Sequence, residues 1–194
     1  MLEKYAKLSL LDRMVIAVQR VHERLKLTTS TLETARIPYA VAGSSAVAAW
    51  LAAKEPSAVR YTRDVDILIR RANFHAVRRA LEAAGLVYQR FKEIDLFLDG
   101  DTPRDAVRII MAGEKVRSTD IFAAPDVNES EHVGPIRLLN LAPLVQMKLA
   151  TFSLNDKVDL RDMLDVGLID QTWVQRFPQE LGERLQVLID TPEG

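Results

Sequence analysis

The sequence predicts an α/β (α+β) protein in which a mixed β-sheet is flanked by helices and followed by a C-terminal helical segment. Three observations support this fold class. Helix-like and strand-like segments alternate over the first half, consecutive strand-like runs reach residue 112, and apolar residues take helical spacing after about residue 137. We expect residues 1–136 to form the core with its N-terminal helix. Residues 137–194 should form a helical region packed on that core.

The composition is that of an ordinary globular protein. The chain has 194 residues, and its 27 acidic and 26 basic residues almost cancel, so no overall positive field favours DNA. The absence of cysteine excludes disulfides, thiolate zinc sites and cysteine nucleophiles. No segment has the apolar length of a signal core or a membrane span, so we expect a cytoplasmic protein that does not contact membranes.

The first half predicts a helix, a short buried strand and a second helix. Ser9 is a candidate N-cap, and apolar residues then recur every three or four positions to about Ala35, which predicts a helix that packs on the core. The stripe consists of Leu11, Met14, Val18, Val21 and Leu25. Pro38 prevents continuation of this helix. Residues 39–42 form the predicted strand, Gly43-Ser44-Ser45 the turn after it, and residues 46–53 the second helix.

The remaining segments complete the predicted sheet and its helical cover. We expect a strand over residues 61–69, a helix over 72–84 that ends at Gly85, and strands over 86–91, 94–98 and 106–112. Residues 115–136 are interpreted as a connecting loop. Three further helices follow, with apolar stripes at residues 141–152, 160–164 and 181–188.

Two acids, Asp64 and Asp66, occupy alternate positions of a predicted strand, so their carboxylates should share one face. Nucleotidyl transfer is limited by charge on phosphates and on the attacking oxygen, and magnesium ions bound by carboxylates neutralise that charge. Asp64-Val65-Asp66 suits such a site. By themselves, however, two acids at this spacing more often form a solvated face.

The glycine turn before the second helix strengthens the case. Gly43 allows close approach of the backbone to a phosphate, and Ser44 and Ser45 offer hydroxyl and amide groups at the first turn of a helix. A Gly-Ser-Ser helix start alone is usually only a cap. The order strand, Gly-Ser, helix, strand with Asp-x-Asp couples the two features.

At this point the sequence resembles the nucleotidyltransferases of the polymerase-beta type, whose small members include antibiotic-modifying enzymes and the toxins of abortive-infection systems. VAGSSAVAAW and YTRDVDILI carry the resemblance over roughly residues 37–70, and LVQMKLATFSLNDKVDLRDMLD extends it less sharply. It implies the nucleotidyltransferase fold, with triphosphate bound by Gly43 and Ser44 and Mg²⁺ by Asp64 and Asp66. It also implies that Lys148 reaches a phosphate.

The C-terminal helices supply further candidates. Lys148 interrupts an apolar stripe, which indicates a buried partner or ligand, although a lysine at the border of the stripe gives the same pattern. The ordinary interpretation of the next charges is a solvated helix face, formed by Asp156, Lys157, Asp159, Arg161 and Asp162. Lys157 and Asp162 match the family's Lys-x-x-x-x-Asp element. The resemblance therefore makes Lys157 a candidate nucleotide contact and Asp162 a candidate residue that positions it.

The sequence departs from the family pattern in two places. Nineteen residues separate Ser44 from Asp64, as in the abortive-infection branch, which Arg60 and Thr62 also fit. The family usually has a third acid in a later strand, and here Arg108 occupies that position. Asp105 and Asp95 are the competing candidates for this catalytic role, and the ordinary interpretation of each is a surface acid beside a turn.

The leading functional hypothesis is a Mg²⁺-dependent transfer of a nucleotidyl group from a nucleoside triphosphate such as ATP to a hydroxyl acceptor. A small molecule, a protein and RNA stay open as acceptors. One alternative is a nucleotide-binding or regulatory module of the same fold without turnover. Another is a toxin-like component of a two-protein system, held inactive by an antitoxin-like partner.

Overall fold

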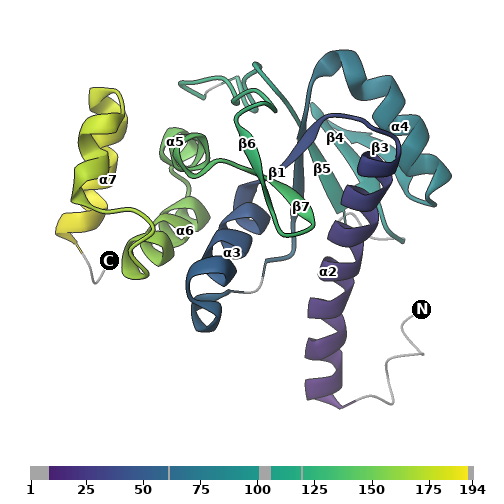
Figure 1. Cartoon of the computed structure of the whole chain (residues 1–194), viewed down its shortest axis with the longest axis horizontal. Helices are drawn as coiled ribbons and strands as arrows, with labels where there is room; N and C mark the ends of the chain where they lie inside the picture. The colour runs from purple at the N-terminus through teal and green to yellow at the C-terminus, as the bar shows by residue number, and fades with distance from the viewer. Residues whose placement is uncertain (1–8, 61, 101–105, 119, 192–194) are drawn as a thin grey trace.

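The computed structural model describes residues 9–60, 62–100, 106–118 and 120–191, and it shows one mixed sheet surrounded by helices (Figure 1). Within these residues the sheet has seven strands in the order β3-β4-β5-β2-β1-β7-β6. The strands are β1 (Tyr39–Ala42), β2 (Val65–Ile69), β3 (Val87–Phe91), β4 (Ile94–Leu98), β5 (Ala106–Met111), β6 (Ser130–Val133) and β7 (Ile136–Leu139). Two pairs are parallel, β2 with β5 and β1 with β7, and the other pairs are antiparallel. The predicted fold class is confirmed.

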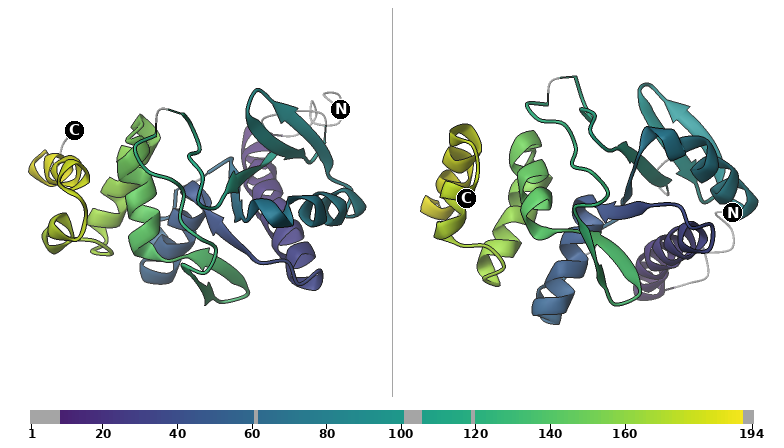
Figure 2. Two further views of the ribbon diagram at one scale, coloured as in Figure 1. Left: turned by 90° about the horizontal axis from the view of Figure 1, so that it is seen from above. Right: turned by 45° about the horizontal axis from the view of Figure 1, so that its top comes forward.

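The helices divide between the two ends of the molecule. They are α2 (Leu10–Thr34), α3 (Gly43–Lys54), α4 (Phe74–Ala83), α5 (Leu141–Thr151), α6 (Leu154–Asp165) and α7 (Gln179–Asp190), with short 3-10 turns at Pro56–Ala58, Arg71–Asn73 and Gln171–Arg176. Helix α2 packs against α4, β2 and β5, whereas α3 contacts α5 and α6, and α7 packs on α5 and α6 (Figures 1 and 2). One continuous apolar core runs from α2 to α7. Among the described helices, none has the length and apolarity that crossing a membrane requires.

Strands β6 and β7 correct the expected loop over residues 115–136. They form an antiparallel hairpin that turns at Gly134 and Pro135, and β7 adds to the sheet beside β1 through the parallel pair Val41 and Leu138. The sequence concealed the hairpin because β6 is polar and its strands have only four residues each. The sheet therefore extends to Leu139.

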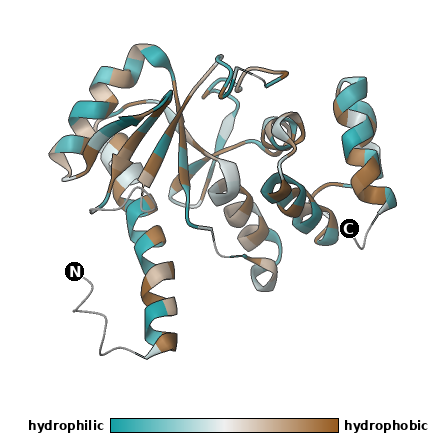
Figure 3. Cartoon of the chain, turned by 180° about the vertical axis from the view of Figure 1, so that it is seen from behind, coloured by the Kyte–Doolittle hydropathy of each residue, from teal (hydrophilic) through white to brown (hydrophobic). Residues whose placement is uncertain are grey.

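Helix α2 begins as predicted, with Ser9 and Asp12 forming a capping box, but only its C-terminal half packs on the core. Val21 is 8% exposed and Leu32 is fully buried, whereas Leu11 and Met14 are 72% and 58% exposed. The N-terminal half projects away from the sheet, and apolar and polar residues alternate along it (Figures 1 and 3). The expectation that the whole stripe packs on the core is wrong, because the helix is longer than the sheet surface beside it.

Replacing Met14 with glutamine is therefore expected to leave stability almost unchanged. An exposed side chain that makes no core contact changes the free energy of unfolding by less than about 0.5 kcal/mol when it is substituted. Thermal unfolding followed by circular dichroism checks this, with an expected Tm change of less than about 2 °C. A fall of several degrees would show that this half of α2 is packed in solution.

Candidate functional site

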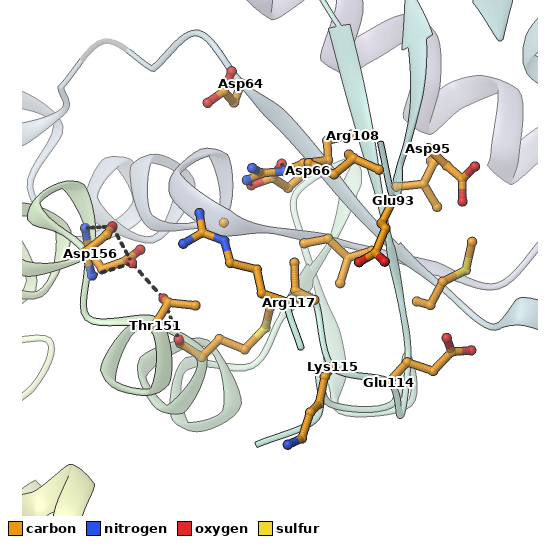
Figure 4. A pocket seen from close by; sticks show the side chains of 18 of the residues that line it. Asp64, Asp66, Glu93, Asp95, Arg108, Glu114, Lys115, Arg117, Thr151 and Asp156 are labelled. Atoms are coloured by element: carbon orange, nitrogen blue, oxygen red, sulfur yellow. Dashed lines mark hydrogen bonds and ion pairs between the residues drawn. The ribbon is translucent and has the colours of Figure 1, made fainter. Parts of the chain in front are cut away.

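A cleft of about 640 Å³ opens where β1 ends and α3 begins. Its walls come from β2, β4, β5, the segment after β5, and helices α5 and α6 (Figure 4). Its charged residues are Asp64, Asp66, Arg71, Arg90, Lys92, Glu93, Asp95, Arg108, Glu114, Lys115, Arg117, Lys148 and Asp156. The volume is that of a site for a small organic ligand. Residues predicted from three distant segments therefore meet in one place.

Gly43 lies directly against Asp66. Ala42, the last residue of β1, is the register partner of Asp66, so the next residue turns over that carboxylate. Gly43 has a φ of +59°, and a Cβ atom at this position would lie 1.9 Å from Oδ2 of Asp66. Both the left-handed backbone and the lack of a side chain are required here. The register of β1 and β2 thus brings the predicted glycine turn next to the predicted Asp-x-Asp segment.

The two serines after Gly43 have different roles. The Ser44 hydroxyl donates to Oδ2 of Asp159 at 2.6 Å and accepts from Nζ of Lys148 at 3.2 Å. The buried Ser45 hydroxyl donates to the backbone carbonyl of Asp64 at 2.6 Å. Ser45 therefore holds the segment before β2, and Ser44 lines the cleft.

Asp64 and Asp66 both line the cleft, but only Asp66 lies within a strand. The predicted strand over residues 61–69 begins only at Val65, because β1 ends opposite Asp66 and provides no partner for earlier residues. Tyr61 lies outside the described residues. Asp64 is exposed on the segment before β2, whereas Asp66 is 2% exposed within it. The expected start of the strand is therefore wrong, whereas both carboxylates line the same cleft, and Figure 4 shows Asp64 set apart from Asp66.

Arg108 occupies the position beside Asp66. The parallel pairing of β2 with β5 makes the two residues register partners. The guanidinium binds the carboxylate through two hydrogen bonds of 2.7 Å, from Nε to Oδ1 and from the second terminal nitrogen to Oδ2. The charge of Asp66, opposed by burial, raises the pKa of Arg108 above its ordinary value. Asp66 thus has a fixed cationic partner within the sheet.

Lys148 is the centre of a second ionic cluster. Its ammonium group lies 2.9 Å from Oδ1 of Asp156 and 2.6 Å from Oδ2 of Asp159, and its side chain is 7% exposed. The Thr151 hydroxyl donates to Oδ2 of Asp156 at 2.6 Å (Figure 4). This cluster brings the predicted Lys148 next to Ser44, at the start of α3. The expectation of a solvated helix face is wrong for Asp156 and Asp159, whose side chains are only 12% and 16% exposed.

The cluster shifts the pKa of its members. Burial opposes the charged form of Lys148, but Asp159 and Asp156 more than offset it, so the pKa of Lys148 is raised. For Asp156, burial acts in the opposite sense to the charge of Lys148 and the hydroxyls of Ser153 and Thr151. The result is a lowered pKa. Lys148 and Asp156 therefore both stay charged at neutral pH.

The candidates for a third acid differ in their placement. Asp95 lies in β4, lines the cleft, is 7% exposed and accepts a hydrogen bond of 2.7 Å from the Tyr88 hydroxyl. It is therefore a buried cleft residue and not the surface acid of the ordinary interpretation. Asp105 lies outside the described residues. The position beside Asp66 is occupied by Arg108, so the catalytic role of either acid stays a prediction.

The remaining candidates lie beside the cleft. The Lys157 ammonium sits 4.6 Å from the centre of the Phe152 ring, and Lys157 does not line the 640 Å³ cleft. Asp162 forms an ion pair of 2.8 Å with Arg60. Burial raises the pKa of Asp162 despite this arginine. Asp162, Arg60 and Thr62 line an adjoining cleft of about 510 Å³, which shares Ser44 and Asp64 with the first.

Several basic residues of the cleft were not candidates in the sequence interpretation, Lys115 and Arg117 among them. Lys115 and Arg117 follow β5 in the segment interpreted as a loop, and both line the cleft. Figure 4 shows the Arg117 guanidinium extending into the cleft from the side opposite Asp64. Within the described part of the chain, the Arg117 side chain forms no ion pair. No local pattern indicates these residues, since their role depends on how the segment folds back.

The residues present do not fit the magnesium pair that the resemblance implies. Both oxygens of Asp66 bind Arg108, a third carboxylate is replaced by that arginine, and Asp64 stands apart. Within the residues that the structure describes, no three His, Cys, Asp or Glu side chains are grouped as metal ligands. Metal binding by Asp64 and Asp66 stays a prediction, and the ion pair between Arg108 and Asp66 argues against it.

Comparisons with known proteins support the fold. No protein-family model and no curated protein sequence matches the chain. Among solved structures, the antibiotic-resistance factor ANT(2'')-Ia is similar with a TM-score of 0.53 at 10% identity, over 88% of this chain and 93% of that one. JHP933 from Helicobacter pylori has a TM-score of 0.51 at 14% identity, over 89% and 74% of the two chains. A putative nucleotidyltransferase from H. pylori has 0.50 at 14%, over 89% and 76%. The chain therefore has a fold similar to that of nucleotidyltransferases.

Proposed function

We propose that the chain is a nucleotidyltransferase that binds a nucleoside triphosphate in the 640 Å³ cleft and transfers its nucleotidyl group to a hydroxyl acceptor. The observation that carries this proposal is the convergence of the Gly43–Ser44 turn, Asp64 and the basic segment after β5 on one cleft. The similarity in fold to the antibiotic-resistance factor supports the same reaction class.

The triphosphate would lie on the Gly43–Ser44 turn. The first turn of α3 offers free backbone N–H groups and the positive end of the helix dipole, and Gly43 has no side chain to obstruct a phosphate. The Arg117 guanidinium extends into the cleft from another wall, and with Lys115, which also lines the cleft, it would neutralise phosphate charge. Lys148 contributes indirectly, since it positions the Ser44 hydroxyl.

The acceptor would enter from the adjoining 510 Å³ cleft. Asp64 lines both clefts and is exposed, so it is the carboxylate best placed to accept a proton. An acceptor hydroxyl attacks the α-phosphorus and forms the new P–O bond, the bond to the β-phosphate breaks, and pyrophosphate leaves. Asp64 takes the proton of the hydroxyl.

Asp64→Asn is expected to leave triphosphate binding almost unchanged and to lower turnover by about 10²–10⁴-fold, because it removes the base and keeps the shape of the side chain. Calorimetry with ATP, GTP, CTP and UTP measures binding, and pyrophosphate release over a panel of hydroxyl acceptors measures turnover. Asp165→Asn, an exposed acid of α6 outside both clefts, is the matched control. Absence of binding for all four triphosphates would refute the proposed function.

A second candidate function is a nucleotide-binding module without turnover. The Arg108–Asp66 ion pair favours it, because the usual position of a third carboxylate is filled by a cation. Triphosphate binding without pyrophosphate release for any acceptor, in both the wild type and Asp64→Asn, would select this candidate.

A further inference from the structure

Arg108 places a fixed positive charge beside Asp66 in the cleft. Asp66 and Arg108 are register partners in adjacent parallel strands, so the backbone of the sheet sets their distance. Their side chains lie side by side in the cleft (Figure 4). The register of β2 and β5 therefore holds the backbones of the two residues side by side, within reach of this ion pair.

Both carboxylate oxygens of Asp66 are engaged by Arg108. Each of its oxygens accepts a hydrogen bond of 2.7 Å from the guanidinium, and the side chain is only 3% exposed. The backbone of Gly43 closes another side, since even a Cβ atom there would lie 1.9 Å from Oδ2. A metal ion could bind Asp66 only by displacing a bidentate arginine from a buried carboxylate, which is costly.

We infer that Arg108 takes the place of a divalent metal ion on Asp66, so that the cleft binds phosphate groups through a built-in guanidinium and without a metal ion. A guanidinium and a metal ion both place positive charge beside this carboxylate. The guanidinium differs in having a fixed position and in requiring no coordination shell.

The remaining donors of Arg108 are suited to a phosphate. A guanidinium has five N–H groups, and two of them bind Asp66. Its side chain is 35% exposed and lines the cleft, so the other N–H groups can reach a ligand. Lys148 cannot take this role, because Asp156 and Asp159 already balance its charge. This second half of the inference rests on the proposed triphosphate site, whereas the exclusion of metal from Asp66 does not.

The first test uses Mn²⁺ alone as the probe and follows the electron paramagnetic resonance signal of the free ion. The wild type is expected to show no saturable binding that involves Asp66. Arg108→Asp restores an acid beside Asp66 and should bind Mn²⁺ at least about 10-fold more tightly than the wild type, since ligand charge sets the affinity of such sites. Equal affinity of the two proteins would overturn the inference.

Two further variants make this result specific. Arg79→Asp makes the same change of charge on the exposed face of α4, outside the cleft, and should not create a Mn²⁺ site. If Arg108→Asp does not fold, Arg108→Gln frees the same carboxylate without adding a second. Mn²⁺ should then raise the Tm of Arg108→Gln and leave that of the wild type unchanged. The reverse pattern would contradict the assignment.

The second test uses inorganic triphosphate as the probe, measured by calorimetry with EDTA and then with Mg²⁺. Equal affinity in the two buffers, and a loss of about 10-fold or more in Arg108→Gln, are the expected results. Binding that requires Mg²⁺ would overturn metal-free recognition. No binding in either buffer would refute the triphosphate site itself, and the Mn²⁺ titration would still decide whether Arg108 excludes a metal ion from Asp66.

Discussion

Gly43→Ala is expected to destabilise the protein by about 3–5 kcal/mol and to weaken triphosphate binding by at least about 100-fold. The new Cβ atom would lie 1.9 Å from Oδ2 and 2.8 Å from Cγ of Asp66, a buried carboxylate that Arg108 holds in place. Asp66 would have to move away from Arg108, and breaking a buried ion pair costs about 3–5 kcal/mol. Urea unfolding gives the stability change, and calorimetry with the nucleoside triphosphates gives the change in affinity.

Gly134→Ala is the matched control for this prediction. Gly134 has a φ of +61°, almost equal to the +59° of Gly43, but nothing lies within 4 Å of a Cβ atom there. The control therefore carries only the left-handed backbone strain, about 1–2 kcal/mol, and should bind triphosphate normally. If the two variants lose the same stability and keep the same affinity, the contact between Gly43 and Asp66 has no role in the site.

The sequence predicted those parts of the fold whose signals are local. Strand β1 and helix α3 were visible because a short apolar run meets a glycine turn, and Pro38 marks the boundary before them. Helix α2 was visible from Ser9 and its apolar spacing. Its exposed half was not, because amphipathic spacing records a potential packing face but not the length of the surface that covers it.

The pairing of strands carried the information that the sequence lacked. Strand β2 appeared to begin at residue 61, but a strand requires neighbours, and β1 ends opposite Asp66. The hairpin of β6 and β7 escaped notice because both strands are short and β6 is polar. Register also decides the candidate site, since it places Arg108 beside Asp66. Arg108 was recognised as the residue in the slot of the third acid, but its bond to Asp66 could not be inferred from spacing.

The burial of the acids around Lys148 also could not be predicted from local sequence patterns. The break in the apolar stripe left open whether Lys148 has a buried partner, a ligand or a place at the border of the stripe, and the structure supplies Asp156 and Asp159 as partners. These acids follow helical spacing that is typical of a solvated face, so the sequence placed them on the surface. Their burial results from the packing of α6 on α3 and α5, which no local pattern encodes.

Lys148→Met is expected to lower the free energy of unfolding by about 3–5 kcal/mol at neutral pH. Methionine fills a similar volume, so the loss comes from leaving Asp156 and Asp159 without a cation in a buried setting. Lys157→Met is the matched control on the neighbouring helix. Lys157 lies over the Phe152 ring and forms no ion pair within the described residues, and its replacement should cost about 1 kcal/mol or less. Equal losses in the two variants would contradict a special role for Lys148.

The pH dependence of the same variant tests the physical reason for the loss. The folded state lowers the pKa of Asp156 below its ordinary 3.8, so the stability it contributes is present above that value and is lost as pH falls through the folded pKa. The raised pKa of Lys148 gives stability that is complete below the ordinary 10.5 and is lost only as pH rises through the folded pKa. Between these limits the difference between wild type and Lys148→Met should stay constant. In acid it should shrink, because protonation removes the unpaired charge of the variant's carboxylates. Urea unfolding from pH 3 to pH 8 measures this difference, and a gap that persists unchanged at pH 3 would assign the loss to packing rather than to charge.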